Sequence, residues 1–484
     1  MRFLQQSSLP LYAVPMLSWS SRSTRAAALL LLIAPLLVSC RSARPSAPLT
    51  PPPLEDAREA AAILPLPTFD SAWTIVARTH WDTTYNGVNW TAMRDSLRPR
   101  AAAAQSQREL RQILQQMLSS LRQSHFSIIP QEVSDVAVGG STNPEASREG
   151  QVGVTTRWLD REVVVTHVTD GSPASRAGVR PGWLLRRVGD DSITNRLRSL
   201  PADLDPRRAS LAAYSLAEGG LRGAPGSTVT VTFVDERGDE RALTMQRSVT
   251  PGTSVKFGNL PPQLAHLEWE RRRVDGKRIG VIRFNIWMPV LGREFDVAID
   301  SLRDSDAIVL DIRGNFGGVA GMAMGFAGHF VDTVVPVGIM KTRAQDLKFA
   351  INPRRVNTAD QRVAPFDGPL AIVVDELSIS TSEIFAGGLQ SLARAHIVGS
   401  RTAGQALPAM AERLPNGDIL YHAIANFVSP SGGRMEGDGV TPDQAVVTDR
   451  RALLAGADPA LDAALKWAAS APKPPRVTGP RITP

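Results

Sequence analysis

The chain has 484 residues, more than one hydrophobic core usually organises, so we expect two to four domains. Hydrophobic residues make up 43% and charged residues 21%, as in an ordinary globular protein. The net charge is only +7 and no dense run of lysine and arginine occurs, which argues against nucleic-acid binding. A single cysteine excludes an intramolecular disulfide and a thiolate cluster, and the seven histidines form no H-x-x-x-H or H-E-x-x-H pair. These counts therefore give no sign of a metal site.

Residues 1–39 have the pattern of an export signal. Arg22 and Arg25 precede an apolar run at 26–38, which is shorter than the roughly 20 residues that a membrane span needs. The run ends in Leu37-Val38-Ser39-Cys40, which resembles the bacterial lipobox, whose cysteine becomes lipidated. The alternative is an ordinary signal peptide with a chance cysteine. Because Arg41, not Asp, follows Cys40, a lipidated protein is expected at the outer membrane.

Residues 40–54 are rich in Pro, Ser and Ala and predict a tether, and residues 55–131 predict a helical region. Ser106 and Glu109 have capping-box spacing at the start of one helix. Apolar residues recur on a single face of that helix, at Leu110, Ile113, Leu114, Met117, Leu118 and Leu121. Ser124 and His125 follow the end of this pattern.

Residues 149–250 change to short strands, such as 162–166 and 228–234. Between these strands, residues 171–185 read G-S-P-A-S-R-A-G-V-R-P-G-W-L-L. This segment resembles the GSPA-x-x-AG-x-x-PGD-x-I segment of PDZ domains, with Trp183 where Asp is usual. PDZ domains take an extended peptide as an added strand, often by its C-terminal carboxylate. The residues lining the carboxylate-binding loop would be Gln151, Val152, Gly153 and Val154. A small β domain without a ligand is the alternative.

Residues 262–450 have the pattern of an α/β core. Residues 370–375, 384–393 and 396–399 predict a strand, a helix and a strand, a βαβ unit typical of mostly parallel sheets. Two further strands are predicted at 279–284 and 307–313. Residues 451–484 predict a last helix at 461–468 and a Pro-rich, disordered tail from 471.

The turn before the helix at 384–393 lies at the carboxyl end of a strand, where such folds place chemistry. Ser380-Thr381-Ser382-Glu383 fits a capping box, so Ser380 could simply cap the helix. The same position also puts a hydroxyl beside unpaired N–H groups at a positive helix end, which could hold an oxyanion.

A second turn, Gly314-Asn315-Phe316-Gly317-Gly318, follows the strand at 307–313. It lacks the Lys-Ser/Thr of a P-loop, so we reject a phosphate cradle. It is either a plain tight turn or a source of backbone N–H groups.

Taken in order, these segments resemble the family of carboxy-terminal-processing and tricorn-like serine peptidases, from about residue 72 to 447. The resemblance rests on the helical arm, the PDZ-like segment, the turns at 311–318 and 378–384, and G-D-G-V-T-P-D at 437–443. It implies a mixed α/β fold, with a ClpP/crotonase-like βα core, an inserted PDZ-like β domain and an N-terminal helical arm.

The resemblance also implies roles for single residues. Ser380 would be the nucleophile, and the N–H groups of Gly318 and Thr381 would form the oxyanion hole. The carboxy-terminal-processing branch carries a catalytic lysine in T-x-G-K, but this sequence has Thr402-Ala403-Gly404-Gln405, which excludes a Ser–Lys dyad at that position.

The tricorn-like branch uses a serine–histidine pair and a distant glutamate, which Ser124, His125 and Glu436 match. His125 would then be the general base, oriented by Ser124 and Glu436. Two alternatives stay open: Asp438 could replace Glu436, and His125 could be a loop histidine without a role. We interpret Ser378 and Ser382 as structural, hydrogen-bonding within the turn.

We therefore predict a serine endopeptidase that cleaves unfolded or extended polypeptides in the bacterial cell envelope, lipid-anchored at Cys40 and independent of cofactors. Its partners would be polypeptide substrates and a membrane lipid, not nucleic acid. The alternative is a catalytically inactive protein on the same fold that binds peptides or apolar ligands.

Overall fold

The computed structural model describes residues 63–132, 149–200, 204–429, 433 and 435–477. The predicted export segment, Cys40 and the tether lie outside these residues. Within the described ranges, no helix combines the length and apolar character needed to cross a membrane.

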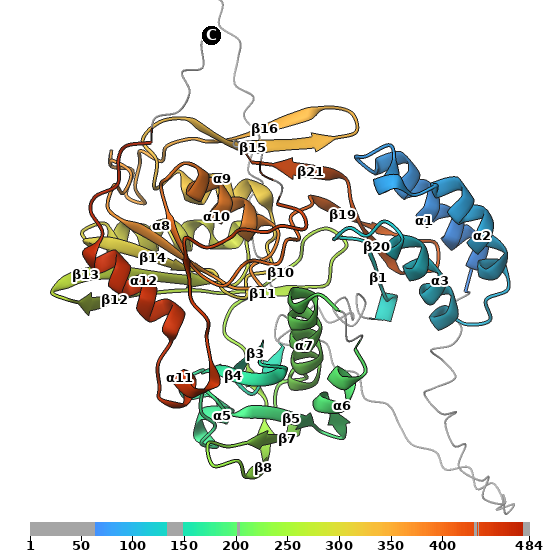
Figure 1. The fold of residues 1–484 in the computed structure, drawn as a ribbon, viewed down its shortest axis with the longest axis horizontal. Helices are drawn as coiled ribbons and strands as arrows, with labels where there is room; N and C mark the ends of the chain where they lie inside the picture. Colours follow the sequence, from blue (N-terminus) through green and yellow to red (C-terminus); the bar gives the residue numbers. More distant parts are fainter. Residues whose placement is uncertain (1–62, 133–148, 201–203, 430–432, 434, 478–484) are drawn as a thin grey trace, which may run out of the picture. The chain divides into compact units, whose positions relative to one another are not determined.

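A six-stranded sheet forms the centre of the α/β core (Figure 1). Its strands from β13 to β22 are parallel, and β12 pairs antiparallel with β13. In spatial order they are β12 (Leu267–Val274), β13 (Lys277–Phe284), β14 (Ala307–Asp311), β17 (Leu370–Val374), β18 (His396–Gly399) and β22 (Gln444–Ala445). The predicted βαβ unit is confirmed as β17, α10 (Thr381–Ser391) and β18. Since carboxyl ends of parallel strands share one edge, the turns after β14 and β17 meet there.

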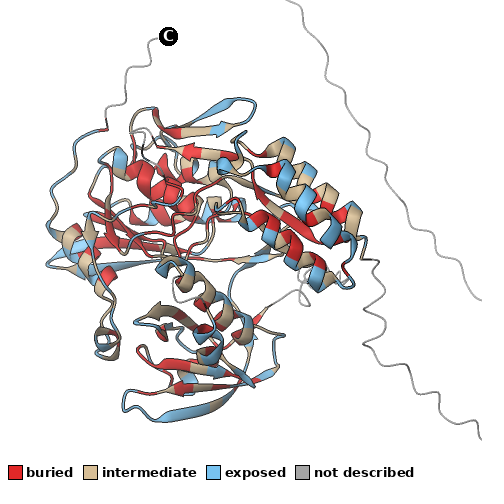
Figure 2. Cartoon of the chain, turned by 45° about the vertical axis from the view of Figure 1, so that its right-hand side comes forward, coloured by how far each residue is buried: buried red, intermediate tan, exposed pale blue. Residues whose placement is uncertain are grey.

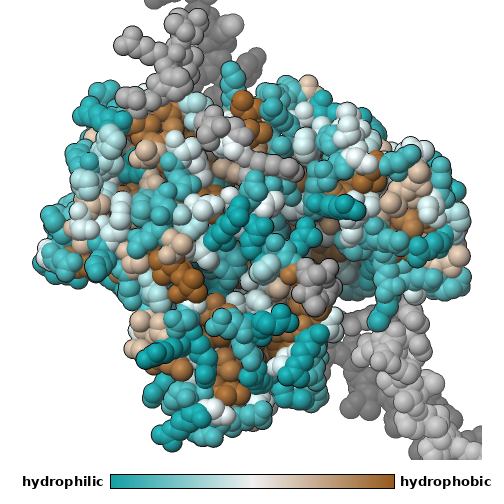
Figure 3. Space-filling view, in the orientation of Figure 1, coloured by the Kyte–Doolittle hydropathy of each residue, from teal (hydrophilic) through white to brown (hydrophobic). Residues whose placement is uncertain are grey.

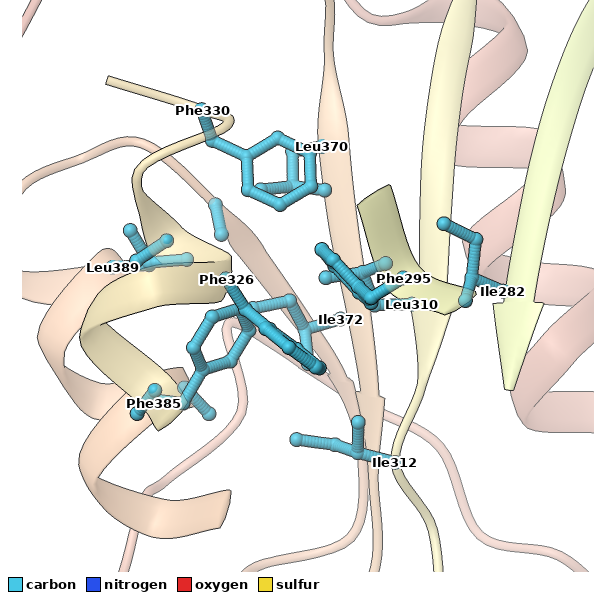
Figure 4. Packing of buried hydrophobic residues seen from close by; sticks show 14 of the residues in the cluster. Ile282, Phe295, Leu310, Ile312, Phe326, Phe330, Leu370, Ile372, Phe385 and Leu389 are labelled. Carbon is cyan, nitrogen blue, oxygen red and sulfur yellow. The ribbon is translucent and has the colours of Figure 1, made fainter. Parts of the chain in front are cut away.

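Helices cover both faces of this sheet because its strands are apolar on both sides. Ile282, Leu310 and Ile372 pack against α8 (Gly292–Leu302), α9 (Ala320–Ala327) and α10. The neighbouring residues Val281, Val309 and Val373 pack against α12 (Pro459–Ser470) on the opposite face. Figure 2 shows the sheet and α10 as the most deeply buried part, and Figure 4 shows aromatic rings filling the space between the sheet and its helices. There Phe295 and Phe326 stack with their ring centroids 3.8 Å apart.

The N-terminal arm consists of α1 (Pro65–Thr79), α2 (Trp90–Ala102) and α3 (Gln107–Ser119), with the short turn η1 (Tyr85–Gly87) between α1 and α2. The predicted apolar face of α3 is buried, and Ser106 Oγ accepts from Glu109 N–H at 3.2 Å. Glu109 instead accepts from Gln105 N–H, so the predicted capping box is only half formed. These helices pack on a sheet of order β1 (Ser127–Ile129), β20 (Ile419–Ala423), β19 (Ala409–Arg413). The region predicted to be helical to 131 also contains the short strand β1, because β1 pairs with a strand far away in the sequence.

Residues 149–249 form what we call the inserted β domain. Its main sheet has the order β3 (Val154–Leu159), β4 (Glu162–Val168), β5 (Leu184–Val188), β7 (Thr228–Val234), β8 (Glu240–Gln246), and β6 (Asp191–Ser192) also pairs with β5. A separate two-stranded sheet pairs β2 (Gly150–Gln151) with β9 (Ser248–Val249). Its helices are α5 (Pro173–Arg176), α6 (Ile193–Arg198) and α7 (Pro206–Leu221). The sequence pattern did not predict α7, because small residues such as Ala213 and Ala217 make its buried face and give little hydrophobic contrast.

Three segments complete the fold. A three-stranded sheet lies beside α10, in the order β16 (Asp346–Ile351), β15 (Val335–Thr342), β21 (Ala425–Val428). A strand pair precedes β12 and consists of β10 (Thr253–Val255) and β11 (Gln263–Ala265). The short connecting helices are η2 (Pro289–Leu291) and α11 (Arg450–Leu454). Disorder predicted from residue 471 is wrong as far as 477, because Val477 is buried in the main core and Lys473 pairs with Asp367. Residues 478–484 lie outside the described part.

The aromatic cluster gives a test of this core. Phe326 is buried against Phe284, Trp287 and Phe295. Phe326→Ala should lower the free energy of unfolding by about 3–5 kcal/mol, because it removes apolar burial and leaves a cavity. Urea unfolding followed by fluorescence measures the change, with Val290→Ala at a more exposed position as the control. Equal midpoints for the two variants would contradict the packing described here.

Candidate active site

Ser380 lies in the turn between β17 and α10, with φ 58° and ψ −115°. A positive φ is rare for a residue with a Cβ, and a strained strand-to-helix turn is a known way to expose a serine Oγ. The strain is held by hydrogen bonds: Ser380 N–H donates to Gln405 O at 2.9 Å and to Glu383 Oε2 at 3.1 Å. The second bond is the carboxylate half of a capping box, so Ser380 caps α10 while the residue itself stays half-buried.

The two neighbouring serines are fixed by hydrogen bonds of their own. Ser378 Oγ donates to Ile312 O at 2.8 Å, and Ser382 Oγ donates to Asn315 O at 2.9 Å while accepting from Trp287 Nε1 at 2.9 Å. Both are buried and join the turn to the end of β14 and to the Gly-rich segment that follows it. These bonds fit a structural role: Ser378 also bonds within the turn, where its Oγ accepts from Asp375 N–H at 3.1 Å, whereas the partners of the Ser382 side chain lie beyond the turn.

The Gly-rich turn packs directly against Ser380. Gly317 has φ 93°, and a Cβ there would lie 2.7 Å from Ser380 Cβ, so no larger residue fits. A Cβ on Gly318 would lie 2.4 Å from Trp287 O. The turn is held by Ile379 N–H donating to Asn315 O at 3.0 Å and by Thr381 Oγ1 donating to Gly318 O at 2.9 Å.

Two amide groups beside Ser380 have no acceptor in the described part of the chain: the N–H groups of Gly318 and Thr381. The neighbouring Gly317 N–H, in contrast, donates to Asn315 Oδ1 at 3.0 Å. Thr381 is the first residue of α10, so its N–H also lies at the positive end of the helix dipole. Two unpaired donors next to a hydroxyl can stabilise a negative oxygen.

His125 is held by a chain of two hydrogen bonds. Its Nδ1 lies 2.6 Å from Ser124 Oγ, and Ser124 Oγ donates to Glu436 Oε2 at 2.8 Å. Ser124 N–H also donates to Glu436 Oε1 at 2.8 Å. Because an ionised carboxylate only accepts, the single hydroxyl proton of Ser124 points to Glu436, and the hydroxyl oxygen accepts from Nδ1–H. The neutral imidazole therefore carries its free lone pair on Nε2, the tautomer that a general base needs.

The structure also distinguishes the two candidate carboxylates. Glu436 is 8% exposed and bonded to Ser124, whereas the side chain of Asp438 is 63% exposed and lies 3.8 Å from Arg401. Glu436 Oε2 further accepts from Ala406 N–H at 3.1 Å. Since the preceding residue, Gln405, accepts from Ser380 N–H, the His125 group and the Ser380 turn share one short segment.

Within the described residues, no hydrogen bond joins Ser380 directly to His125. The imidazole packs against the Tyr421 ring, with centroids 5.5 Å apart, and residue 125 has a strained φ of 61°. Burial lowers the pKa of His125 to about 4, so the side chain is neutral at pH 7.

Glu383 is a site residue whose role the sequence did not indicate beyond capping. Its buried carboxylate accepts from Thr402 Oγ1 at 2.6 Å, Gly404 N–H at 2.7 Å and Gln405 N–H at 2.9 Å, in addition to Ser380 N–H. Burial raises the pKa of Glu383 to about 7, an effect that these four donors oppose. No sequence pattern identifies such a carboxylate, since its partners come from a loop about 20 residues downstream.

The predicted peptide-binding residues lie in the inserted β domain, away from Ser380. Gln151 ends β2, Val154 begins β3, and Val152 and Gly153 form the bend between them. The domain contacts the core through Arg157, whose Nε donates to Asp375 Oδ2 at 2.6 Å, and through Tyr214, whose ring lies 4.9 Å from that of Phe316. Across the described ranges, no group of three or more His, Cys, Asp or Glu side chains is placed to hold a metal.

Comparison with known proteins identifies the family. Residues 278–446 match the model of peptidase family S41, and residues 67–119 match that of the tricorn protease C1 domain. Together with the relatives below, these matches support a peptidase of the S41 type, similar to the carboxyl-terminal-processing and tricorn-like serine peptidases. The family named from the sequence and its mixed α/β fold are thus confirmed.

Individual relatives are distant. The chain is 24% identical over 401 residues to carboxyl-terminal-processing peptidase 3, chloroplastic, of Arabidopsis thaliana, covering 81% of this chain and 70% of the relative. It is 26% identical over 301 residues to a probable CtpA-like serine protease of Staphylococcus aureus (strain COL), covering 62% of this chain and 53% of that relative. It therefore spans only about half the length of the bacterial relative.

Solved structures agree in fold. The photosystem II D1 C-terminal processing protease matches with a TM-score of 0.52 and 20% identity, covering 81% of this chain and 97% of that one. Mature CPAF matches with a TM-score of 0.52 and 13% identity, covering 80% and 94%. At these identities the likeness establishes the mixed α/β fold alone.

The hydrogen bonds of His125 make a prediction that needs no substrate. Nitrogen-15 NMR of labelled histidine should show a neutral Nδ1–H imidazole that remains unprotonated until the pH falls to about 4. Comparison with His125→Gln assigns the resonance among the seven histidines. An Nε2–H tautomer, or titration near the ordinary value of about 6.5, would contradict the described hydrogen-bond chain.

Proposed function

We propose that the protein is a serine endopeptidase in which Ser380 is the nucleophile and His125 the general base. The observation that supports this most is the chain from Glu436 through Ser124 to His125, which presents the lone pair of Nε2. Ser124 and Glu436 orient the imidazole and stabilise the imidazolium that forms on proton transfer.

In the proposed reaction, Ser380 Oγ attacks the peptide carbonyl carbon while His125 Nε2 takes the hydroxyl proton. The carbonyl oxygen becomes an oxyanion that accepts from the N–H groups of Gly318 and Thr381. Each such donor contributes roughly 10²–10³-fold in rate. His125 then gives its proton to the leaving amine, and water activated by the same imidazole hydrolyses the acyl-enzyme.

Among the described residues, no hydrogen bond joins Ser380 to His125, and our proposal includes its formation in the complex with substrate. Catalytic hydrogen bonds are often long or absent without a ligand. The shared segment at Gln405 and Ala406 connects the two groups, so a small movement there changes their separation.

We further propose that the inserted β domain is PDZ-like and recruits an extended polypeptide at Gln151, Val152, Gly153 and Val154. An edge strand, β3, with the helix α7 beside it is the arrangement that supports strand addition. The export pattern and Cys40 support a lipid-anchored enzyme of the cell envelope, which is also part of this proposal.

Cleavage of an unfolded protein tests the peptidase proposal. Residues 41–484 should degrade casein, and Ser380→Ala should reduce the rate by about 10⁴-fold or more, because the attacking oxygen is lost. Cleavage by both proteins would indicate a contaminant or a different nucleophile. Cleavage by neither, in folded samples, would count against an active peptidase.

A matched pair of variants tests the orienting carboxylate. Glu436→Gln should lower kcat by about 10²–10⁴-fold with little change in KM, because the imidazolium loses its negative partner. Asp438→Asn should stay close to wild type, since its exposed side chain faces Arg401. The assignment fails if the Asp438 variant loses more activity than the Glu436 variant.

A further inference from the structure

A groove in the inserted β domain runs between β3 and α7. β3 is an end strand of its sheet, and α7 packs beside it. The groove is part of a cavity of about 1360 Å³ between this domain and the central sheet. Figure 3 shows apolar and hydrophilic surface side by side where the inserted domain meets the core.

The head of this groove is the bend between β2 and β3. Gly150 and Gly223 exchange two backbone hydrogen bonds, of 2.7 and 3.0 Å, which attach the end of α7 to the bend. Among the described residues, no group accepts from the N–H of Val152 or Gly153. These two donors alone would suit the carboxylate at the end of a peptide.

A carboxylate of the chain itself already occupies this neighbourhood. Glu218, in the last turn of α7, is 7% exposed and lines the cavity. Gln151 Nε2 donates to Glu218 Oε2 at 2.9 Å, so Glu218 lies beside the first residue of the bend. Arg222 contacts both Glu218, at 3.2 Å, and Glu149, at 3.4 Å.

Among the described residues, the ion pairs at the head of the groove contain more carboxylates than guanidinium groups. Arg157, which also lowers the pKa of Glu218, is already paired with Asp375. Three carboxylates, Glu218, Glu149 and Asp375, therefore face two guanidinium groups. Burial raises the pKa of Glu218, while the adjacent Arg222 opposes that rise. A peptide carboxylate would add a further negative charge in a poorly solvated place, which costs free energy.

We propose that Glu218 makes this groove discriminate against a free C-terminal carboxylate, so that it takes internal segments of an extended polypeptide. The inference rests on the proposed peptide recruitment and refines its ligand class. The cavity lining continues past Glu149 to Thr250, whose N–H donates to Glu149 O at 3.0 Å, and to Pro251. With this preference, cleavage begins at internal sites of a polypeptide substrate and not at its C-terminus.

Binding of one peptide in two forms tests the proposal directly. The full-length chain carrying Ser380→Ala, which prevents cleavage, is titrated at pH 8 with a fluorescent 12-residue Ala/Val-rich peptide, followed by anisotropy. The C-terminal amide should bind about tenfold more tightly than the free acid. Glu218→Gln should raise the affinity for the acid to near that for the amide, so that the variant no longer prefers the amide.

The exposed Glu240, on the far edge strand β8, provides the matched control. Glu240→Gln should leave the preference for the amide as in wild type. The proposal is overturned if the groove with the wild-type Glu218 binds the free acid as tightly as the amide or more tightly, a result that does not depend on the folding of any Glu218 variant. It is also overturned if neither peptide binds. Casein cleavage by the active chain is measured separately, so loss of the peptidase proposal is distinguishable from loss of this one.

Discussion

The site depends on one buried carboxylate, Glu383, and the four hydrogen bonds that it accepts. Burying a carboxylate without a cation is costly, so its donors must be supplied by fixed backbone and hydroxyl groups. Those donors come from the Ser380 turn and from the segment Thr402 to Gln405. One side chain thus holds the strained serine and the loop beside it in a single geometry.

The loop that begins at Thr402 also contacts the residues that hold His125. Ala406 N–H donates to Glu436, and Glu436 fixes Ser124 and the His125 tautomer. Ser124 and Glu436 are 312 positions apart, and the pairing of β1 with β20 brings their segments into the same region. The N-terminal arm is therefore part of the site, not an appendage to it.

Local patterns predicted much of the fold. The βαβ unit at 370–399, the buried face of α3 and strand β7 follow from periodicities within a few residues. The helix α7, strand β1 and the packed position of Val477 escaped prediction, because small residues or distant partners determine them.

Part of the candidate site was likewise predicted from sequence motifs, and part depends on contacts in the folded chain. Motifs singled out Ser380, Ser124, His125 and Glu436, and the structure links the last three by hydrogen bonds. The choice of Glu436 over Asp438 required burial and partners that the sequence does not contain. Glu383 and Glu218 likewise matter through neighbours that only the folded chain supplies.

The most direct measurement of the central claim is covalent labelling with a serine-directed fluorophosphonate, read by intact mass and peptide mapping. Our account predicts a single adduct, on Ser380, whose formation slows strongly in His125→Ala because the hydroxyl loses its base. An adduct that forms at the same rate without His125 would contradict the assigned base. Labelling of another residue, or of none in the folded protein, would contradict the assigned nucleophile.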